Sequence, residues 1–202
     1  MKVSLSLQLG PRVVSPAGTE DVFEDFEAYG VGQVLPSGGW SAFGGLPTVE
    51  EGIQADGLIG KYLRVDSGEG IRRIGHWRDF ILEMNVKRSA PWSVLKVYFR
   101  LSDDAEKGYY LVGGAQDVGF SLYKFNRGEG KDVLLGRKDL FDPGGDWFYL
   151  GIEVKGGEIK VRVNEEEILT AKDESPLSLG GFAIASEFDA IFCDNIRIER
   201  RR

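Results

Sequence analysis

The chain has few of the residues on which disulfide-bonded or metal-stabilised folds depend. Its 202 residues include one cysteine, Cys193, and one histidine, His76. A single cysteine excludes an internal disulfide, so the fold does not depend on an oxidising compartment. One histidine and one distant cysteine are too few soft ligands for a zinc site. We therefore expect a fold stabilised by its hydrophobic core, which a chain of this length can form.

Long apolar runs and a basic surplus are also absent. No stretch approaches the roughly 18 apolar residues of a membrane span. Residues 1–9 alternate apolar and polar side chains, unlike the continuous apolar region of a signal peptide. The net charge of −7 argues against nucleic acid as the main partner, because phosphate binding needs a concentrated basic surface.

Amide side chains are scarce, whereas glutamate, arginine and lysine are plentiful. Asparagine and glutamine are thermolabile, and charged residues form the ion-pair networks that are common in heat-adapted proteins. The composition therefore leans towards a thermophilic source.

Helical periodicity is missing, but strand periodicity recurs along the chain. Apolar side chains occupy every second position in the ranges 78–87, 92–101, 146–155 and 157–163. Such alternation is typical of strands with one buried face. Turn signals separate these strands, and Gly156-Gly157 predicts a tight hairpin between the last two.

About a dozen short strands without helical crossovers predict an all-β fold. We expect an antiparallel two-sheet β-sandwich of the jelly-roll kind. A polar break with glycine and proline at residues 10–21 suggests that residues 1–20 form an N-terminal arm or strand. The sandwich is then expected to span residues 21–202.

Several short motifs resemble the concanavalin A-like lectin/glucanase superfamily. The chain opens with F-E-D-F-E at residues 23–27 and G-G-W at residues 38–40. Residues 97–111 read V-Y-F-R-L-S-D-D-A-E-K-G-Y-Y-L, which is similar to laminin-G-like and 3-keto-disaccharide-hydrolase-type members. Other matching pieces are F-I-L-E-M at 80–84, L-Y-K at 122–124, W-F-Y-L-G-I-E-V at 147–154, V-R-V-N at 161–164, G-G-F-A-I at 180–184 and D-N-I-R-I at 194–198.

The resemblance implies two stacked, curved antiparallel sheets. Members of the superfamily are mostly sugar-binding modules, glycoside hydrolases, or structural and adhesive domains, and the fold does not decide among these roles. Glucanase members carry an E-x-D-x-x-E strand whose two carboxylates act as nucleophile and acid/base. That motif is not found here, since residues 24–27 have the wrong spacing for it. We therefore name no catalytic residue.

A polar sheet face with aromatic side chains is the candidate ligand site. If strands 78–87 and 92–101 are neighbours, their polar positions share one concave face. Aromatic rings can stack on sugar rings while charged and amide groups bind the hydroxyls. The alternative is a solvent-facing sheet with cross-strand aromatic and ionic pairs. The candidate residues are Glu83, Asn85, Trp92, Lys96, Tyr98, Arg100, Tyr110, Trp147 and Tyr149.

Acidic residues near both ends of the sandwich are the candidate metal site. Simple alternation places Asp194 on the core side with Phe192, where an unpaired carboxylate would be costly. Glu24, Asp25 and Asn195 are oxygen donors that lie near Asp194 if the first and last strands pair. This set suits a structural Ca²⁺, which superfamily members often hold near their termini. The alternatives are a carboxylate that caps loop amides and a β-bulge that turns Asp194 outward.

Three functions follow from these features. The leading one is a non-catalytic carbohydrate-binding or adhesive module. The second is a structural virion or cell-surface protein, in which the strand at residues 2–8 pairs with a protein partner or another copy of the chain. The third is a glycoside hydrolase or lyase, which predicts two carboxylates facing one groove. A lectin-like role would place the protein outside the cell or on a virion surface, and otherwise it is expected in the cytoplasm.

Overall fold

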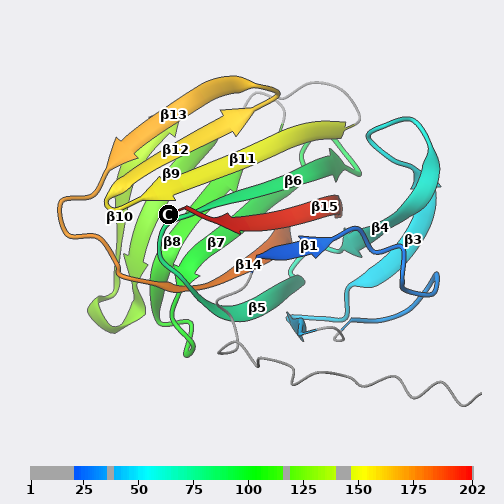
Figure 1. Cartoon of the computed structure of the whole chain (residues 1–202), viewed down its shortest axis with the longest axis horizontal. Helices are drawn as coiled ribbons and strands as arrows, with labels where there is room; N and C mark the ends of the chain where they lie inside the picture. Colours follow the sequence, from blue (N-terminus) through cyan, green and yellow to red (C-terminus); the bar gives the residue numbers. More distant parts are fainter. Residues whose placement is uncertain (1–20, 36–38, 116–118, 140–146, 202) are drawn as a thin grey trace, which may run out of the picture.

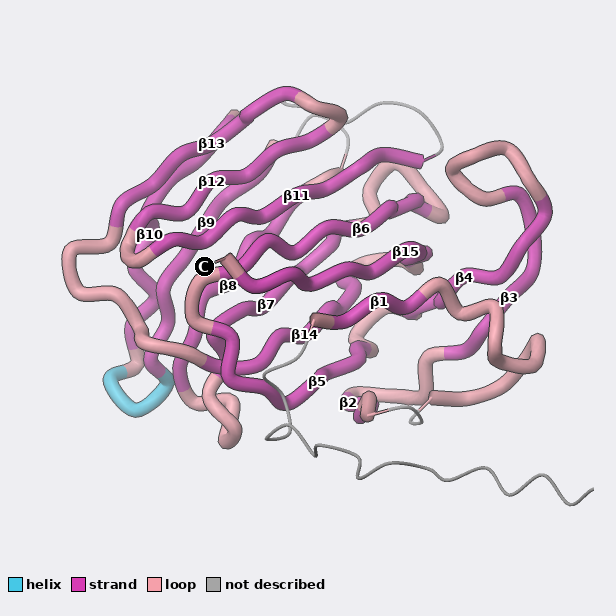
Figure 2. The backbone as a smooth tube through the Cα atoms, viewed as in Figure 1, coloured by secondary structure: helices cyan, strands magenta, loops and turns pink. Residues whose placement is uncertain are grey.

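Two antiparallel sheets lie face to face in the computed structural model, which describes residues 21–35, 39–115, 119–139 and 147–201 (Figures 1 and 2). In these ranges the only helical element is one 3-10 turn, η1 (Arg127–Glu129). None of the described residues forms a helix long and apolar enough to cross a membrane. The predicted all-β, two-sheet β-sandwich is confirmed.

The first sheet has eight strands and includes both ends of the described chain. Its order is β13-β12-β11-β6-β15-β4-β3, and β1 pairs with β15 beside this path. Its strands are β1 (Val22–Glu24), β3 (Thr48–Ile53), β4 (Ile59–Val65), β6 (Phe80–Arg88), β11 (Trp147–Lys155), β12 (Glu158–Val163), β13 (Glu166–Lys172) and β15 (Ile191–Arg200).

The second sheet has seven strands and lies behind the first in Figure 1. Its order is β10-β9-β8-β7-β14-β5-β2. Its strands are β2 (Ser41–Phe43), β5 (Gly70–Trp77), β7 (Val94–Leu101), β8 (Lys107–Gly113), β9 (Phe120–Asn126), β10 (Lys131–Lys138) and β14 (Gly180–Glu187).

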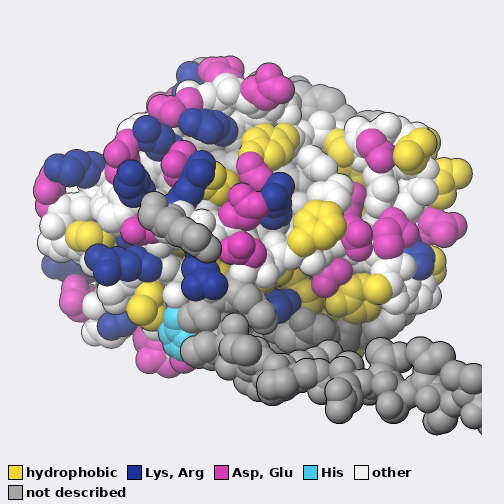
Figure 3. Space-filling view, in the orientation of Figure 1, with side chains coloured by type: hydrophobic (Ala, Val, Ile, Leu, Met, Phe, Trp, Pro, Cys, Tyr) yellow, Lys and Arg dark blue, Asp and Glu magenta, His cyan; other side chains and the backbone are white. Residues whose placement is uncertain are grey.

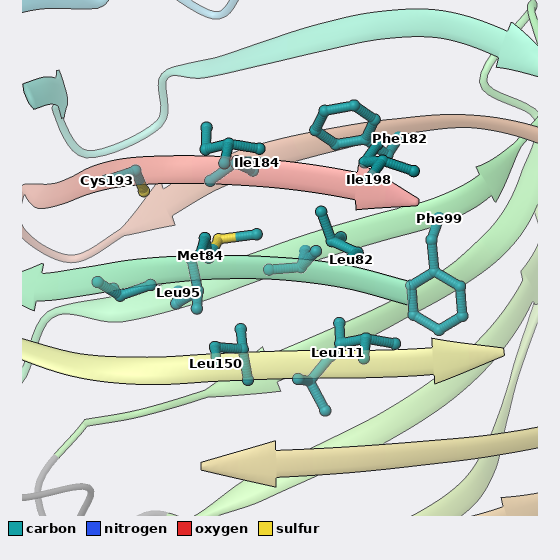
Figure 4. Packing of buried hydrophobic residues seen from close by; sticks show 14 of the residues in the cluster. Leu82, Met84, Leu95, Phe99, Leu111, Leu150, Phe182, Ile184, Cys193 and Ile198 are labelled. Carbon is teal, nitrogen blue, oxygen red and sulfur yellow. The ribbon is translucent and has the colours of Figure 1, made fainter. Parts of the chain in front are cut away.

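The hydrophobic core fills the space between the sheets, as strand alternation predicts. Leu82, Met84 and Leu150 of the eight-stranded sheet pack against Leu95 and Phe99 of the seven-stranded sheet (Figure 4). Each of these side chains is almost fully buried. Burial of one such side chain stabilises the fold by roughly 2 kcal/mol, so the core needs no covalent support.

The tight hairpin predicted at Gly156-Gly157 is confirmed between β11 and β12. Gly156 has a φ of 57°, a conformation that glycine adopts without steric cost. A Cβ atom on Gly157 would lie 2.2 Å from the backbone oxygen of Asp173. Glycine is therefore required at both positions, for different reasons.

The strands predicted over 78–87 and 92–101 do not lie side by side. β6 pairs with β11 and β15 in the eight-stranded sheet, whereas β7 pairs with β8 and β14 in the seven-stranded sheet. Residues 89–93 cross from one sheet to the other. Alternation identified the buried face of each strand correctly, but a strand in either sheet shows the same alternation.

Arg100 is buried, although alternation places it on the polar face of its strand. The pairing of β7 with β14 shifts register beside it, and Arg100 has a φ of 43°. This bulge turns the Arg100 side chain inward, where it is 2% exposed. Leu101, predicted to be a core residue, instead packs with Phe125 and Ala183 in a separate small cluster.

The first and last described strands pair with each other, which is the condition on which the predicted metal site depends. In β1 and β15, Val22 lies opposite Ile198 and Glu24 opposite Ile196. The predicted N-terminal arm of residues 1–20, including the strand at residues 2–8, lies outside the described residues.

Candidate functional site

The predicted ligand-binding residues do not share one face. Lys96, Tyr98 and Tyr110 lie on the outer face of the seven-stranded sheet, in β7 and β8. Trp92 lies just before β7 and is 62% exposed. Arg100 is a buried structural residue. The other four, Glu83, Asn85, Trp147 and Tyr149, lie on the outer face of the eight-stranded sheet, in β6 and β11.

A row of outward positions crosses the seven-stranded sheet from edge to edge. Cross-strand neighbours in such a row lie close enough for their side chains to interact. In this row, Ala183 lies between a cation, Arg72, on one side and three consecutive tyrosines on the other. In strand order it reads Ser41, Arg72, Ala183, Tyr98, Tyr110, Tyr123 and Leu134.

A hollow of about 450 Å³ opens on this outer face. It covers part of the row and extends towards the loop that joins β7 to β8 and towards η1. The lining residues are Ser41, Ala42, Phe43, Arg72, Tyr98, Leu101, Ala105, Phe125, Arg127 and Ala183. Of the sequence-predicted residues, only Tyr98 lines the hollow.

Small residues in β14 make room for the hollow. Ala183 and Ala185 point outward while Phe182 and Ile184 join the core, so β14 is bulky inside and small outside. The neighbouring strands carry Arg72 and Tyr98 beside Ala183, and these larger side chains form the walls. The alternation of alanine with large residues in β14 is a sequence signal for this hollow, although we did not recognise it from the sequence.

Aromatic rings form one wall of the hollow and continue beyond it. Tyr98 meets Phe125 edge to face, with ring centroids 6.0 Å apart. Tyr98 also contacts Tyr110 at 5.7 Å, and Tyr110 stacks on Tyr123 at 4.9 Å. These contacts favour the observed orientations of the rings, so the wall has its shape without a ligand.

The hydroxyl groups of the two central tyrosines differ in their bonding. The Tyr110 hydroxyl donates to Oδ2 of Asp132 at 2.8 Å. Within the described residues, the Tyr98 hydroxyl has no hydrogen-bond partner, although its ring is half-buried. Burial raises the pKa of Tyr98 above its ordinary value, so this hydroxyl is a neutral donor at physiological pH.

Two guanidinium groups, of Arg72 and Arg127, lie at the hollow. Arg72 donates one hydrogen bond to the backbone oxygen of Asp103 at 2.8 Å. Neither arginine forms an ion pair within the described ranges, and no carboxylate lines the hollow there. Lys96, in contrast, forms an ion pair with Glu187 at 2.5 Å.

The outer face of the eight-stranded sheet is built from paired groups. The Tyr149 hydroxyl donates to Oε1 of Glu83 at 2.6 Å, and burial and this carboxylate together raise the Tyr149 pKa. Arg162 lies 4.0 Å from carboxylate oxygens of both Glu153 and Glu167. Figure 3 shows basic and acidic side chains interspersed over this face. This face therefore resembles the predicted alternative, a solvent-facing sheet with cross-strand pairs.

Of the predicted metal site, Glu24 is already engaged by protein donors. Its carboxylate accepts hydrogen bonds from the backbone of Phe26, the Tyr29 hydroxyl and the indole of Trp40, at 3.0–3.2 Å. No group of three or more histidine, cysteine, aspartate or glutamate side chains within the described residues is arranged to hold a metal ion. The Glu24 carboxylate is therefore bonded within the protein, and calcium at the four predicted residues stays a prediction.

Asp194 is turned away from the core by the β-bulge that we considered as an alternative. The pairing of β15 with β6 shifts register after Asp194, and Asn195 has a φ of 52°. Asp194 lies opposite Asn85 yet is fully buried, and its carboxylate accepts from the backbone and side-chain nitrogens of Asn195. Burial raises its pKa to about 6, and the nearby charges of Asp25 and Glu27 add to the rise.

A pair of carboxylates does share one shallow groove, although not in the hollow. Glu83 and Glu153 both line a small depression on the eight-stranded sheet, together with Tyr149 and Arg162. Glu83 is bonded to Tyr149, and Glu153 faces Arg162 and Arg201.

Comparisons with known proteins agree with the fold. No family model matches the chain. A curated relative, an uncharacterised protein of Methanocaldococcus jannaschii, is 28% identical over 179 residues, which cover 88% of this chain and 79% of that protein.

Three solved structures share the architecture. The carbohydrate-binding module CBM66 from Bacillus subtilis has a TM-score of 0.61 at 21% identity and covers 80% of this chain and 95% of that one. A galectin-like protein of unknown function from Bacillus subtilis scores 0.60 at 13%, covering 89% and 100%. A β-glucanase from Bacillus licheniformis scores 0.58 at 13%, covering 93% and 100%. The likeness to these structures shows the fold, a two-sheet jelly-roll β-sandwich.

Proposed function

We propose that this protein is a carbohydrate-binding module that holds its glycan in the hollow on the seven-stranded sheet. The observation that carries the proposal is the combination, in one hollow, of aromatic rings with the Tyr98 hydroxyl, which has no hydrogen-bond partner within the described residues, and with two arginines that have no ion-pair partner there. The rings of Tyr98 and Phe125 offer an apolar surface to the C–H face of a sugar ring. The Tyr98 hydroxyl and the arginines can donate hydrogen bonds to its hydroxyls, and the Ser41 hydroxyl, which donates to the backbone oxygen of Arg72, can accept one.

The size of the hollow supports this role. Its volume of about 450 Å³ lies within the range of small-ligand sites, which is roughly 300–1,000 Å³. Ala183 in its lining has a short side chain, so a sugar ring can approach β14 closely. The neighbour CBM66 is described as a carbohydrate-binding module, which is consistent with a sugar ligand for this architecture.

A glycan panel with paired variants tests the proposal. Purified protein is measured against neutral and acidic glycans by titration calorimetry, with Tyr98→Ala and Tyr149→Ala alongside the native chain. The two tyrosines lie on opposite outer faces, so each serves as the control for the other. We expect Tyr98→Ala to weaken binding at least tenfold, about 1.4 kcal/mol, and Tyr149→Ala to leave it unchanged. Equal binding by all three proteins would place the ligand elsewhere.

A second candidate function is glycoside hydrolysis at the groove that contains Glu83 and Glu153. Hydrolases use two carboxylates on either side of the scissile bond. The same glycan mixtures are therefore analysed for cleavage products with the native chain and with Glu83→Gln. Products that disappear in Glu83→Gln would favour this function over a binding module.

A further inference from the structure

We propose that the glycan is acidic, with its carboxylate or sulfate held between Arg72 and Arg127. This inference rests on the proposed function, because it assigns a ligand class to the same hollow. Its starting point is a charge imbalance. The whole chain carries a net charge of −7, yet the lining of the hollow contains two arginines and, within the described residues, no aspartate or glutamate.

The acidic side chains whose charge acts on Tyr98 are engaged with other partners. Asp132 accepts a hydrogen bond from the Tyr110 hydroxyl at 2.8 Å, and Glu187 is paired with Lys96. Asp104 accepts from the Ser102 hydroxyl at 2.6 Å and from the backbone of Glu106. Asp103 meets Arg72 through its backbone oxygen. Within the described residues, none of these carboxylates is hydrogen-bonded or ion-paired to Arg72 or Arg127, so both guanidinium groups can still contact an anionic ligand.

The two arginines lie on opposite sides of the hollow. Arg72 comes from β5, and Arg127 follows the end of β9. In the sheet order, β14, β7 and β8 lie between these strands, and they carry Ala183 and Tyr98 in the hollow. A ligand seated on Ala183 and against Tyr98 thus has a cation on either side.

Arginine suits this role for a geometric reason. Its planar guanidinium presents a fork of N–H donors that matches two oxygens of a carboxylate or a sulfate. Because these groups lie at a partly enclosed hollow, their attraction to an anion is screened less than on an open surface. One sugar can therefore stack on an aromatic ring of the wall while its anionic group meets an arginine.

The test uses matched acidic and neutral glycans in chelator-containing buffer. Trigalacturonate is compared with its carboxyl-reduced neutral counterpart, and a sulfated galactose oligomer is the third probe. The full chain is titrated alongside the double variant Arg72→Gln/Arg127→Gln, the single variant Arg127→Gln, and the control Arg162→Gln on the opposite face. Melting curves check that each variant is folded, and Arg127 is exposed, so its single variant keeps the test valid if the double variant is unstable.

We expect the native chain to bind at least one acidic probe at least tenfold more tightly than the neutral one. The double variant should lose that preference, Arg127→Gln should lose part of it, and Arg162→Gln should keep it. Preference for trigalacturonate indicates a uronate, and preference for the sulfated oligomer indicates a sulfate ester. Tyr98-dependent binding of neutral glycans alone would overturn this inference and retain the proposed function. Binding of the acidic probes that is unaffected by the arginine variants would overturn the assignment to Arg72 and Arg127. If no probe binds, both this inference and the proposed function are overturned.

Discussion

The outer faces of the two sheets carry similar residue types, tyrosines and arginines, but differ in whether these side chains have hydrogen-bond or ion-pair partners. On the eight-stranded sheet, Tyr149 is bonded to Glu83 and Arg162 lies between two carboxylates. On the seven-stranded sheet, Tyr98 has no hydrogen-bond partner and Arg72 has no ion-pair partner within the described residues. A satisfied group contributes to stability, whereas an unsatisfied one in a hollow is available to a ligand. Because both faces contain the same residue types, composition alone does not locate a binding face.

The largest expected effect concerns Arg100, a cation of the seven-stranded sheet that is fully satisfied. It donates to the backbone oxygens of Arg78 and Gly156 at 2.6–2.8 Å and pairs with Asp79 at 3.2 Å. Arg100→Gln removes these four hydrogen bonds and should lower the free energy of unfolding by roughly 4 kcal/mol, about 1 kcal/mol for each bond. Urea denaturation measures this change. A loss below about 1 kcal/mol would contradict the structural role assigned to Arg100.

The next largest effect concerns Asp194. Unlike the paired carboxylates of the eight-stranded sheet, this buried carboxylate has no cationic partner within the described residues. Its pKa is about 6 in the folded chain and about 3.9 unfolded, so the folded state binds the proton more tightly. This favourable contribution is complete below about pH 4 and is lost as the pH rises through 6. Asp194→Asn should therefore stabilise the protein by on the order of 2 kcal/mol at pH 8 and by little at pH 4. Melting temperatures at both pH values, with Asp103→Asn as the exposed control, measure the difference.

The same variant tests the predicted calcium site. Calcium bound by the four predicted residues, which include Asp194, would neutralise the buried charge and stabilise the native chain at pH 7. We expect the melting temperature to rise with calcium and fall with chelator in the native chain but not in Asp194→Asn. A melting temperature unmoved by excess chelator would count against calcium. The difference in side-chain pairing between the two outer faces does not depend on this result.

The smallest effect comes from removing one hydroxyl on each face. Tyr149→Phe loses the bond to Glu83 and should lower the free energy of unfolding by about 1 kcal/mol without changing glycan affinity. Tyr98→Phe loses no internal bond and should leave stability unchanged while weakening glycan binding. Paired denaturation and calorimetry experiments would measure both quantities. Equal stability losses for the two variants would contradict the comparison on which the site assignment rests.

Much of the fold was predictable because alternation reports burial directly. The apolar positions of β6, β11 and β12 were all assigned correctly, since each strand has one face towards the core. Asp194 and Arg100 were misplaced by the same rule, because a β-bulge inserts an extra residue and reverses the faces beyond it. Single bulges leave no periodic signal in the chain.

The candidate site was less predictable than the fold. Tyr98 was identified from its aromatic side chain on a polar face, but Arg72 and Arg127 were not, since each lies far from Tyr98 in the chain. Glu83, Asn85, Trp147 and Tyr149 were grouped with Tyr98 because β6 and β7 follow each other in the chain. Their assignment to opposite sheets separates them by the full thickness of the core.

The all-β class, the buried face of most strands and the hairpin at Gly156-Gly157 could be predicted from the sequence, because these depend on local alternation and backbone conformation. Which strands are neighbours, and therefore which side chains share an outer face, is established only in the folded chain. Strand order depends on packing between residues far apart in the chain, which no local pattern records. It is this order that brings Arg72, Ala183 and Tyr98 into one hollow while Glu83 and Tyr149 face the other way.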